Sequence, residues 1–327
     1  MITLVTGISG HLGSRLVRLL VQRGARVRGS YRPGDAPGPA ANLLDEAVPC
    51  DALDRAGVER LVQGVDRIFN VAAMVTFDPS LYKRQMQVNV EGTRSLVEAA
   101  ARAGVRRLVH TSTVNTLGIP RPGTVGDEQT PSNWQRYGMG YMDSKRESEA
   151  LVLAANSPGE LETLAVLPGT MFGPWDVNDN GGTYIKLGAL GVLLAAPPGG
   201  TSVVHVDDVA RGHILAMERG TAGRSYVLGG ENLTYRRIFT LITRALDRRP
   251  PLLTLPLMAA APLARLSDRI RARTGLPLKL QEGQLVATSS RLFYSSERAK
   301  TELGYTFRPA PEALEDAVRW YREMGRI

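Results

Sequence analysis

Three glycines at three-residue intervals separate an apolar run from a helix-like run near the start of the chain. The apolar run covers residues 2–6, and the stretch TGISGHLG then leads into Leu12–Arg23, where leucines recur at the helical period. A strand, a tight glycine turn and a helix N-terminus form an anion site, because the first N–H groups of the helix are free and glycine lets a pyrophosphate approach the backbone. The pattern predicts a nucleotide site, with a purely structural turn as the alternative.

Strand-like and helix-like segments alternate through the first half of the chain. The expected strands are 2–6, 26–31, 67–71, 107–112 and 161–167, and the expected helices are Leu12–Arg23, Ala56–Gln63, Val88–Ala103 and Tyr141–Ala155. Apolar strands that alternate with helices indicate an α/β fold with a doubly wound parallel sheet. We expect residues 1–167 and about 203–228 to form a nucleotide-binding domain, and about 168–202 with 229–327 to form a smaller C-terminal substrate domain.

A tyrosine with a lysine four residues later occurs in the stretch YMDSK. Tyr141 and Lys145 therefore share one face of the expected helix. A phenol exchanges protons poorly at neutral pH unless its anion is stabilised, and a nearby ammonium stabilises it. Such a pair can give a proton to a carbonyl oxygen or take one from an alcohol. The alternative is an ordinary amphipathic helix with a solvated lysine.

Together these motifs resemble the extended branch of the short-chain dehydrogenase/reductase family. The likeness covers residues 1 to about 230 and extends to SSERAKTELGYTFRP near the end of the chain. Within the family, the sequence is most similar to the dihydroflavonol-reductase-like subgroup, which includes hydroxysteroid dehydrogenase-like proteins. The resemblance implies a Rossmann fold, an NAD(P) cofactor and the catalytic residues Thr113, Tyr141 and Lys145. Thr113 stands where serine is commoner in the family, and the neighbouring Ser112 is the alternative hydroxyl.

The resemblance also implies which residues contact the cofactor. They belong to the glycine loop, the strand ends and the motif LPGTMFGPWD, and they are Thr6, Gly7, Ser9, Gly10, His11, Leu12, Gly13, Arg32, Asp51, Ala52, Ala72, Ala73, Thr111, Ser112, Tyr141, Lys145, Pro168, Gly169, Thr170 and Met171. Asp51 matches the family's acid near the adenine amino group. It also suits a helix N-cap, so both interpretations stay open.

The end of the second expected strand bears on the choice between NADP(H) and NAD(H). An acid there would bond the ribose hydroxyls and repel a 2′-phosphate, whereas an arginine would pair with that phosphate. Counted from the glycine loop, Tyr31 and Arg32 occupy these positions, and Asp35 beyond the turn is the rival partner for the ribose. The sequence therefore favours NADP(H), with NAD(H) as the alternative.

The combined motifs predict an NADPH-dependent reductase of a ketone or aldehyde, or an alcohol dehydrogenase, with the proton supplied by Tyr141. A nucleotide-sugar epimerase with tightly bound NAD is the first alternative, and a non-catalytic NADP-sensing regulator is the second. We expect the substrate pocket near 72–78, 136–141, 170–176 and the tail around 250–280. Its candidate lining residues, mostly apolar and so indicating a hydrophobic small molecule, are Met74, Thr76, Phe77, Met139, Phe172 and Trp175.

Composition narrows the class of protein further. The net charge is +8, but the basic residues are scattered and match no recognition motif, so nucleic acid is not an expected partner. The apolar stretch at 250–266 is short and broken by prolines, so we expect no membrane span, although it could form an exposed flap. One cysteine, no ligand-spaced histidine cluster and no visible secretory signal indicate a cytoplasmic protein without a metal. The family resemblance implies a monomer or a homodimer.

Overall fold

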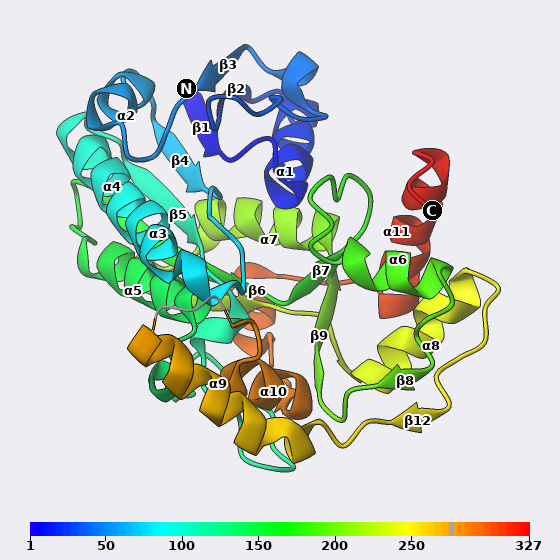
Figure 1. Cartoon of the computed structure of the whole chain (residues 1–327). Coiled ribbons are helices and arrows are strands. Elements are labelled where there is room, and N and C mark those ends of the chain that lie inside the picture. The colour runs from blue at the N-terminus through cyan, green and yellow to red at the C-terminus, as the bar shows by residue number, and fades with distance from the viewer. Residues whose placement is uncertain (275–277) are drawn as a thin grey trace.

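A seven-stranded parallel sheet forms the centre of the computed structural model, which describes residues 1–274 and 278–327 (Figure 1). Its strand order is β10-β6-β5-β4-β1-β2-β3. The bounds are β1 Ile2–Thr6, β2 Arg26–Tyr31, β3 Glu46–Pro49, β4 Arg67–Asn70, β5 Arg107–Thr111, β6 Glu162–Pro168 and β10 Ser225–Leu228. The order reverses between β1 and β4, which opens a crevice at the carboxyl ends of these strands. The predicted doubly wound α/β fold is confirmed.

Helices cover both faces of this sheet. α1 (His11–Gln22) and α7 (Val206–Arg219) pack on one face, in a core that includes Leu16 and Ile214. The other face is covered by α2 (Arg55–Leu61), α4 (Gly92–Arg102) and α5 (Gly140–Ala154). The predicted helix at 88–103 begins earlier in the structure, because α3 (Tyr82–Met86) and a π-turn (Gln87–Glu91) lead directly into α4.

A smaller sheet lies beside the carboxyl ends of the large one. It contains β7 (Thr170–Phe172), β9 (Gly200–His205), β11 (Glu231–Thr234) and β13 (Arg291–Leu292), with α6 (Gly182–Ala189), α8 (Tyr235–Ala245) and α11 (Ala310–Glu323) around it. Because β9 pairs with β7 and β11, the strand-like piece after residue 203 belongs to this sheet, and the chain returns to the large sheet through α7. The division into two domains remains our proposal.

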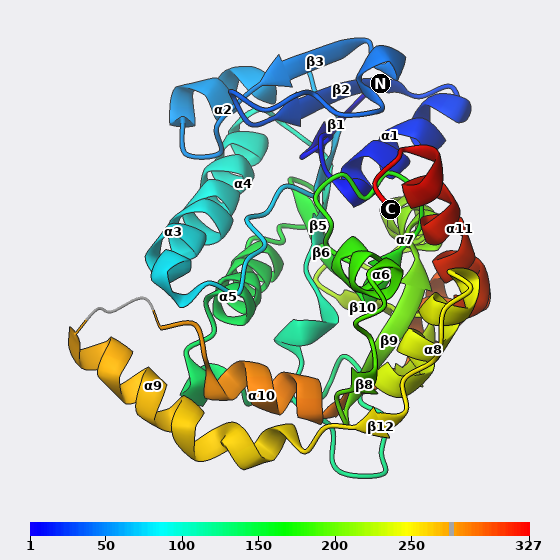
Figure 2. The same cartoon turned by 45° about the vertical axis from the view of Figure 1, so that its right-hand side comes forward.

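The segments 250–274 and 278–289 lie along the lower margin of the molecule in Figure 2. The first contains β12 (Leu253–Thr254), which pairs with β8 (Ala195–Ala196), and α9 (Ala261–Thr274), and the second contains α10 (Glu282–Ser289). Part of the predicted substrate tail, residues 275–277, lies outside the described residues. In the described part of the chain, no helix combines the length and the apolarity that a bilayer crossing requires.

Candidate active site

The glycine loop turns the chain from β1 into α1 at the crevice. Gly7 has a φ of +72°, and a side chain there would meet Ala72 in the segment after β4. A Cβ on Gly13 would lie 2.2 Å from the carbonyl oxygen of Gly7, whereas one on Gly10 would lie at 3.4 Å. Since Gly10 at the N-cap has no side chain, the first N–H groups of α1 are left for an anion. The loop therefore has the geometry of an anion site, and a pyrophosphate at this place stays a prediction.

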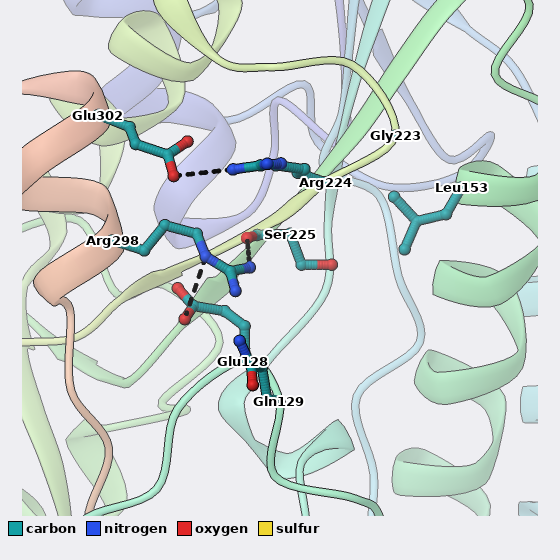
Figure 3. Close-up of a pocket in the computed structure, with 8 residues that line it drawn as sticks. All are labelled: Glu128, Gln129, Leu153, Gly223, Arg224, Ser225, Arg298 and Glu302. Carbon is teal, nitrogen blue, oxygen red and sulfur yellow. Dashed lines mark hydrogen bonds and ion pairs between the residues drawn. The ribbon is translucent and has the colours of Figure 1, made fainter.

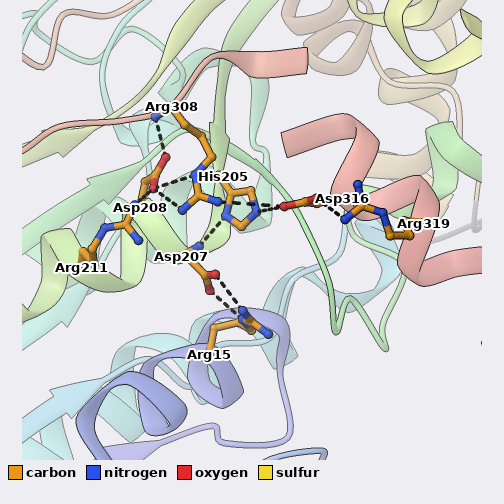
Figure 4. A network of polar contacts seen from close by, with 8 residues as sticks. All are labelled: Arg15, His205, Asp207, Asp208, Arg211, Arg308, Asp316 and Arg319. Atoms are coloured by element: carbon orange, nitrogen blue, oxygen red, sulfur yellow. Dashed lines mark hydrogen bonds and ion pairs between the residues drawn. The ribbon is translucent and has the colours of Figure 1, made fainter. Parts of the chain in front are cut away.

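A network of polar side chains connects α1 with α7, the smaller sheet and the C-terminal helix α11 (Figure 4). Arg15 on α1 donates two hydrogen bonds of 2.6 and 2.7 Å to Asp207, at the start of α7. The N–H of Asp207 donates to Nδ1 of His205, so the proton of this imidazole is on Nε2, 3.3 Å from Asp316 of α11. The position of the glycine helix is thus coupled to three other elements.

The predicted catalytic residues meet at the crevice. Tyr141 lies in the first turn of α5, and Thr113 follows β5, with its hydroxyl beside the phenol. Burial raises the pKa of Tyr141 above the ordinary value, and the bond from Thr113 opposes that rise. Lys145 is 2% exposed, and its ammonium donates to the carbonyl oxygen of Thr111 at 2.5 Å. Burial lowers the pKa of Lys145 to about 8, while Glu149 acts against that shift.

A directed chain of hydrogen bonds fixes the imidazole of His110, whose Nε2 lies 3.5 Å from the ammonium of Lys145. The hydroxyl of Thr6 accepts from the N–H groups of residues 71–72 and donates to Oδ1 of Asn70. Asn70 therefore turns Nδ2 toward Nδ1 of His110, 3.1 Å away, which leaves the imidazole proton on Nε2 facing Ser148 at 3.3 Å. Burial holds the pKa of His110 well below its usual value, so the ring stays neutral beside the lysine. Nothing in the sequence motifs pointed to His110.

The structure separates the two candidate hydroxyls after β5. Ser112 donates to Glu149 on α5 at 2.6 Å, and Glu149 also accepts from Thr116 and Ser225. Ser112 thus points into a buried polar cluster, and Thr113 is the hydroxyl that lies beside Tyr141. Thr111 is engaged as well, because its hydroxyl lies 2.8 Å from Nε2 of His213.

The remaining predicted cofactor residues are distributed around the crevice. Leu12 and His11 lie in the first turn of α1, Ser9 precedes it, and Nε2 of the buried His11 has no partner in the described structure. Asp51 accepts from the N–H of Leu53 in the turn that contains Ala52, so it also fulfils a local structural role. The segments after β4 and β6 contribute the others, Ala72, Ala73, Pro168, Gly169, Thr170 and Met171.

Arg32 is exposed at the end of β2. It donates to Asp35 through Nε at 3.1 Å and Nη2 at 2.8 Å, which raises the pKa of the guanidinium. Arg32, the predicted partner of a 2′-phosphate, and Asp35, the alternative partner of the ribose, therefore pair with each other. A 2′-phosphate at this place would have to compete with the Asp35 carboxylate for the same donors.

The six predicted substrate residues fall into two groups. Phe77 is 43% exposed and packs edge-on against Tyr141 with ring centroids 5.6 Å apart, and Met74 and Thr76 lie on the same segment. The members of the second group, of which Met139 is the N-cap residue of α5, pack within the protein. Met139 and Phe172 are 2% exposed in the core, and Trp175 stacks on Arg15 beneath α1. For this second group, the placement argues for packing rather than for substrate contact.

A surface depression of about 570 Å³ lies at the edge strand β10 (Figure 3). It is lined by Glu128, Gln129, Leu153, Gly223, Arg224, Ser225, Arg298 and Glu302. Arg224 pairs with Glu302 at 2.9 Å, and Arg298 lies 3.7 Å from Glu128. None of the predicted site residues lines it, so this depression is distinct from the crevice around Tyr141.

Comparisons with known proteins agree with this geometry. The model of the NAD dependent epimerase/dehydratase family matches residues 3–229. The chain is 34% identical to sterol demethylase protein B of Methylococcus capsulatus, over the full length of both, and 30% identical to a putative dihydroflavonol 4-reductase of Synechocystis, over 99% of this chain and 95% of that protein. The crystal structure of gox2253 superposes with a TM-score of 0.89 at 36% identity, covering 100% of this chain and 99% of the other.

Proposed function

The chain belongs to the NAD-dependent epimerase/dehydratase family, in the extended branch of the short-chain dehydrogenases/reductases, and we propose that it is a cytoplasmic NADPH-dependent carbonyl reductase. The predicted family and the predicted class of NAD(P)-dependent enzyme are confirmed. The observation that carries the proposal is that Tyr141 interacts with the Thr113 hydroxyl and packs against the exposed ring of Phe77, while the buried Lys145 one helical turn later bonds the carbonyl oxygen of Thr111. The substrate we propose is a ketone or aldehyde on a hydrophobic ring system.

The chain's own residues account for the proton and the orientation in this reaction. The nicotinamide, when bound, supplies the hydride. Thr113 donates a hydrogen bond to the carbonyl oxygen, and Tyr141 gives its phenolic proton to that oxygen as negative charge develops. The ammonium of Lys145 then stabilises the phenolate, because a positive charge close by favours the ionised form of the phenol. In the opposite direction the same phenolate accepts the proton of an alcohol.

Two further observations support the finer details of the proposal. Phe77 covers one side of Tyr141 with an apolar face and carries no charge for the pyrophosphate of a nucleotide sugar, which favours a hydrophobic substrate over a sugar nucleotide. The names of two relatives similar along their whole length, a sterol demethylase protein and a dihydroflavonol reductase, both denote ring compounds. Arg32 offers its guanidinium to a 2′-phosphate, with Asp35 as the competing acceptor.

The test is NADPH oxidation with a panel of cyclic ketones, compared with NADH and with the variants Arg32→Ala and Asp35→Asn. We expect Arg32→Ala to weaken NADPH binding about tenfold or more, because a charge-assisted pair with phosphate is lost, and to leave NADH binding unchanged. Asp35→Asn, the matched change in the same pair, is expected to strengthen NADPH binding. Tightly bound NAD in the purified protein together with epimerase activity would overturn the reductase proposal.

A further inference from the structure

Large apolar side chains are exposed along the margin of the molecule formed by residues 190–194 and 252–266. Six of them, which we call the apolar margin, are Leu194, Leu252, Leu255, Met258, Leu263 and Leu266. Leu252 is 75% exposed and Leu263 is 61% exposed. Scattered exposed leucines are ordinary, but a continuous set of this kind marks a surface that binds something.

The fold brings the segments that carry these residues together along one margin. β12 pairs with β8, and the N–H groups of Leu252 and Leu255 donate to the carbonyl oxygens of Leu194 and Ala196. The short helix Leu257–Ala260 then continues directly into α9. Both views show β12 and α9 along the same lower margin of the molecule (Figures 1 and 2).

α9 carries two neighbouring stripes on its exposed face. Leu263 and Leu266 are spaced three residues apart and form the apolar stripe, while Arg269 and Arg273 extend a basic stripe beside it. Within the described residues, neither of these two arginines takes part in an ion pair. A helix with leucines next to arginines suits the boundary between lipid headgroups and acyl chains, where arginine extends its charge to the phosphates.

The charge of the surrounding segment is strongly one-sided. Residues 248–274 contain the arginines 248, 249, 265, 269, 271 and 273, but a single acid, Asp268. Asp268 pairs with Arg271 at 2.5 Å and Glu282 of α10 pairs with Arg265 at 2.6 Å, so Arg248, Arg249, Arg269 and Arg273 carry the excess charge. A symmetric contact with a second copy would bring the same arginines together, so the margin does not suit self-association. An anionic surface suits it, because the arginines attract headgroups while the leucines enter the apolar layer.

We propose that the apolar margin binds the surface of an anionic lipid bilayer. Its position also connects it to the crevice, because Gln281, between α9 and α10, donates to the carbonyl oxygen of Phe77, the residue that packs on Tyr141. The bound enzyme would therefore present its crevice near the source of a lipophilic substrate. This last point rests on the proposed function, whereas binding to the bilayer does not.

The test is flotation of the full chain with vesicles of phosphatidylcholine and phosphatidylglycerol, compared with pure phosphatidylcholine. We expect binding to the anionic vesicles that weakens in high salt, because surface charges are screened. Leu263→Glu is expected to lower the vesicle partition coefficient about tenfold or more, and Arg269→Ala about fivefold. The matched controls lie elsewhere on the surface, Met324→Glu at the end of α11 and Arg26→Ala at the start of β2, and both are expected to bind as the unaltered protein does.

Three results would overturn this proposal. They are failure of the unaltered protein to float at low salt, an equal loss in the control variants, or a dimer without vesicles that Leu263→Glu converts to monomer. NADPH binding and the thermal unfolding midpoint of each variant are measured alongside, so that a folding defect is recognised. A protein that floats but reduces no ketone would contradict the proposed function and leave bilayer binding supported.

Discussion

The sheet around the glycine loop and the segment 250–274 differ in whether their leucines are buried or exposed. Leu4 in β1 and Leu16 in α1 are fully buried, and Gly7 and Gly13 between them leave no room for a side chain. Leu252, Leu263 and Leu266 are largely exposed on the margin below the crevice. In the first region the apolar side chains are buried and stabilise the site. In the second region they are exposed and can contact another surface. Substitutions in the two regions should therefore affect different quantities.

The largest expected effect distinguishes a residue that takes part in the chemical step from one that contacts the substrate. Tyr141→Phe removes the proton donor, so we expect kcat to fall by about 10³ to 10⁴ while NADPH binding is kept. Phe77→Ala removes an aromatic face beside the same phenol, and we expect mainly a higher KM. Steady-state kinetics with NADPH and a ketone substrate separate the two, and an equal loss of kcat in both variants would remove the distinction.

The next largest expected effect is on the free energy of unfolding, which should depend on a leucine of the first region and not on one of the second. Leu16→Ala leaves a cavity in the core under the sheet and is expected to lower the free energy of unfolding by about 2 to 5 kcal/mol. Leu266→Ala on the exposed face of α9 is expected to change it by less than about 0.5 kcal/mol. Urea unfolding followed by circular dichroism measures both. A large loss in Leu266→Ala would mean that this leucine is part of a core in solution.

Within the glycine loop, two matched substitutions should have different effects. Gly13→Ala places a Cβ 2.2 Å from the carbonyl oxygen of Gly7, so the loop must shift, and we expect a loss of about 1 to 3 kcal/mol in unfolding free energy. Gly10→Ala has room for its Cβ at 3.4 Å, so its stability should change little while its affinity for NADPH falls. Calorimetry of unfolding and of NADPH binding distinguishes them, and unchanged affinity in Gly10→Ala would argue against a pyrophosphate at this helix end.

The smallest expected effect is the pH dependence due to Lys145. With its pKa lowered to about 8, the ammonium is lost as pH rises above 8, and kcat/KM for reduction should decline there. Burial of the charge also costs stability below pH 8. Between pH 8 and the unfolded pKa of about 10.5 the unfolded chain binds the extra proton, so this group makes stability rise with pH in that window. Lys145→Met should abolish both trends, and a decline near pH 8 that persists in it would assign the titration to another group.

Several elements could be predicted from the sequence, and the exceptions have physical causes. The strands β1, β2, β4, β5 and β6 were predicted within about a residue. Four of them are largely buried runs between turn signals, whereas β2, with the sequence RVRGSY, follows from its place between the first helix and the next turn. β3 was missed because Glu46–Pro49 is a short edge strand that is largely exposed and therefore has no apolar pattern. α6 was missed because it lies in a stretch rich in glycine and proline, where pattern arguments favour a loop.

The sequence by itself determined the nucleotide-binding βα unit, the family and the Tyr141–Lys145 pair, because each depends on spacing within one short segment. Tertiary structure alone decided that Thr113 and not Ser112 faces Tyr141, that His110 stands behind Lys145, and that Phe77 covers the phenol. These contacts join residues that lie tens of positions apart in the chain, and no local periodicity encodes such distances. The apolar margin has the same origin, because only the pairing of β8 with β12 brings Leu194 beside Leu252.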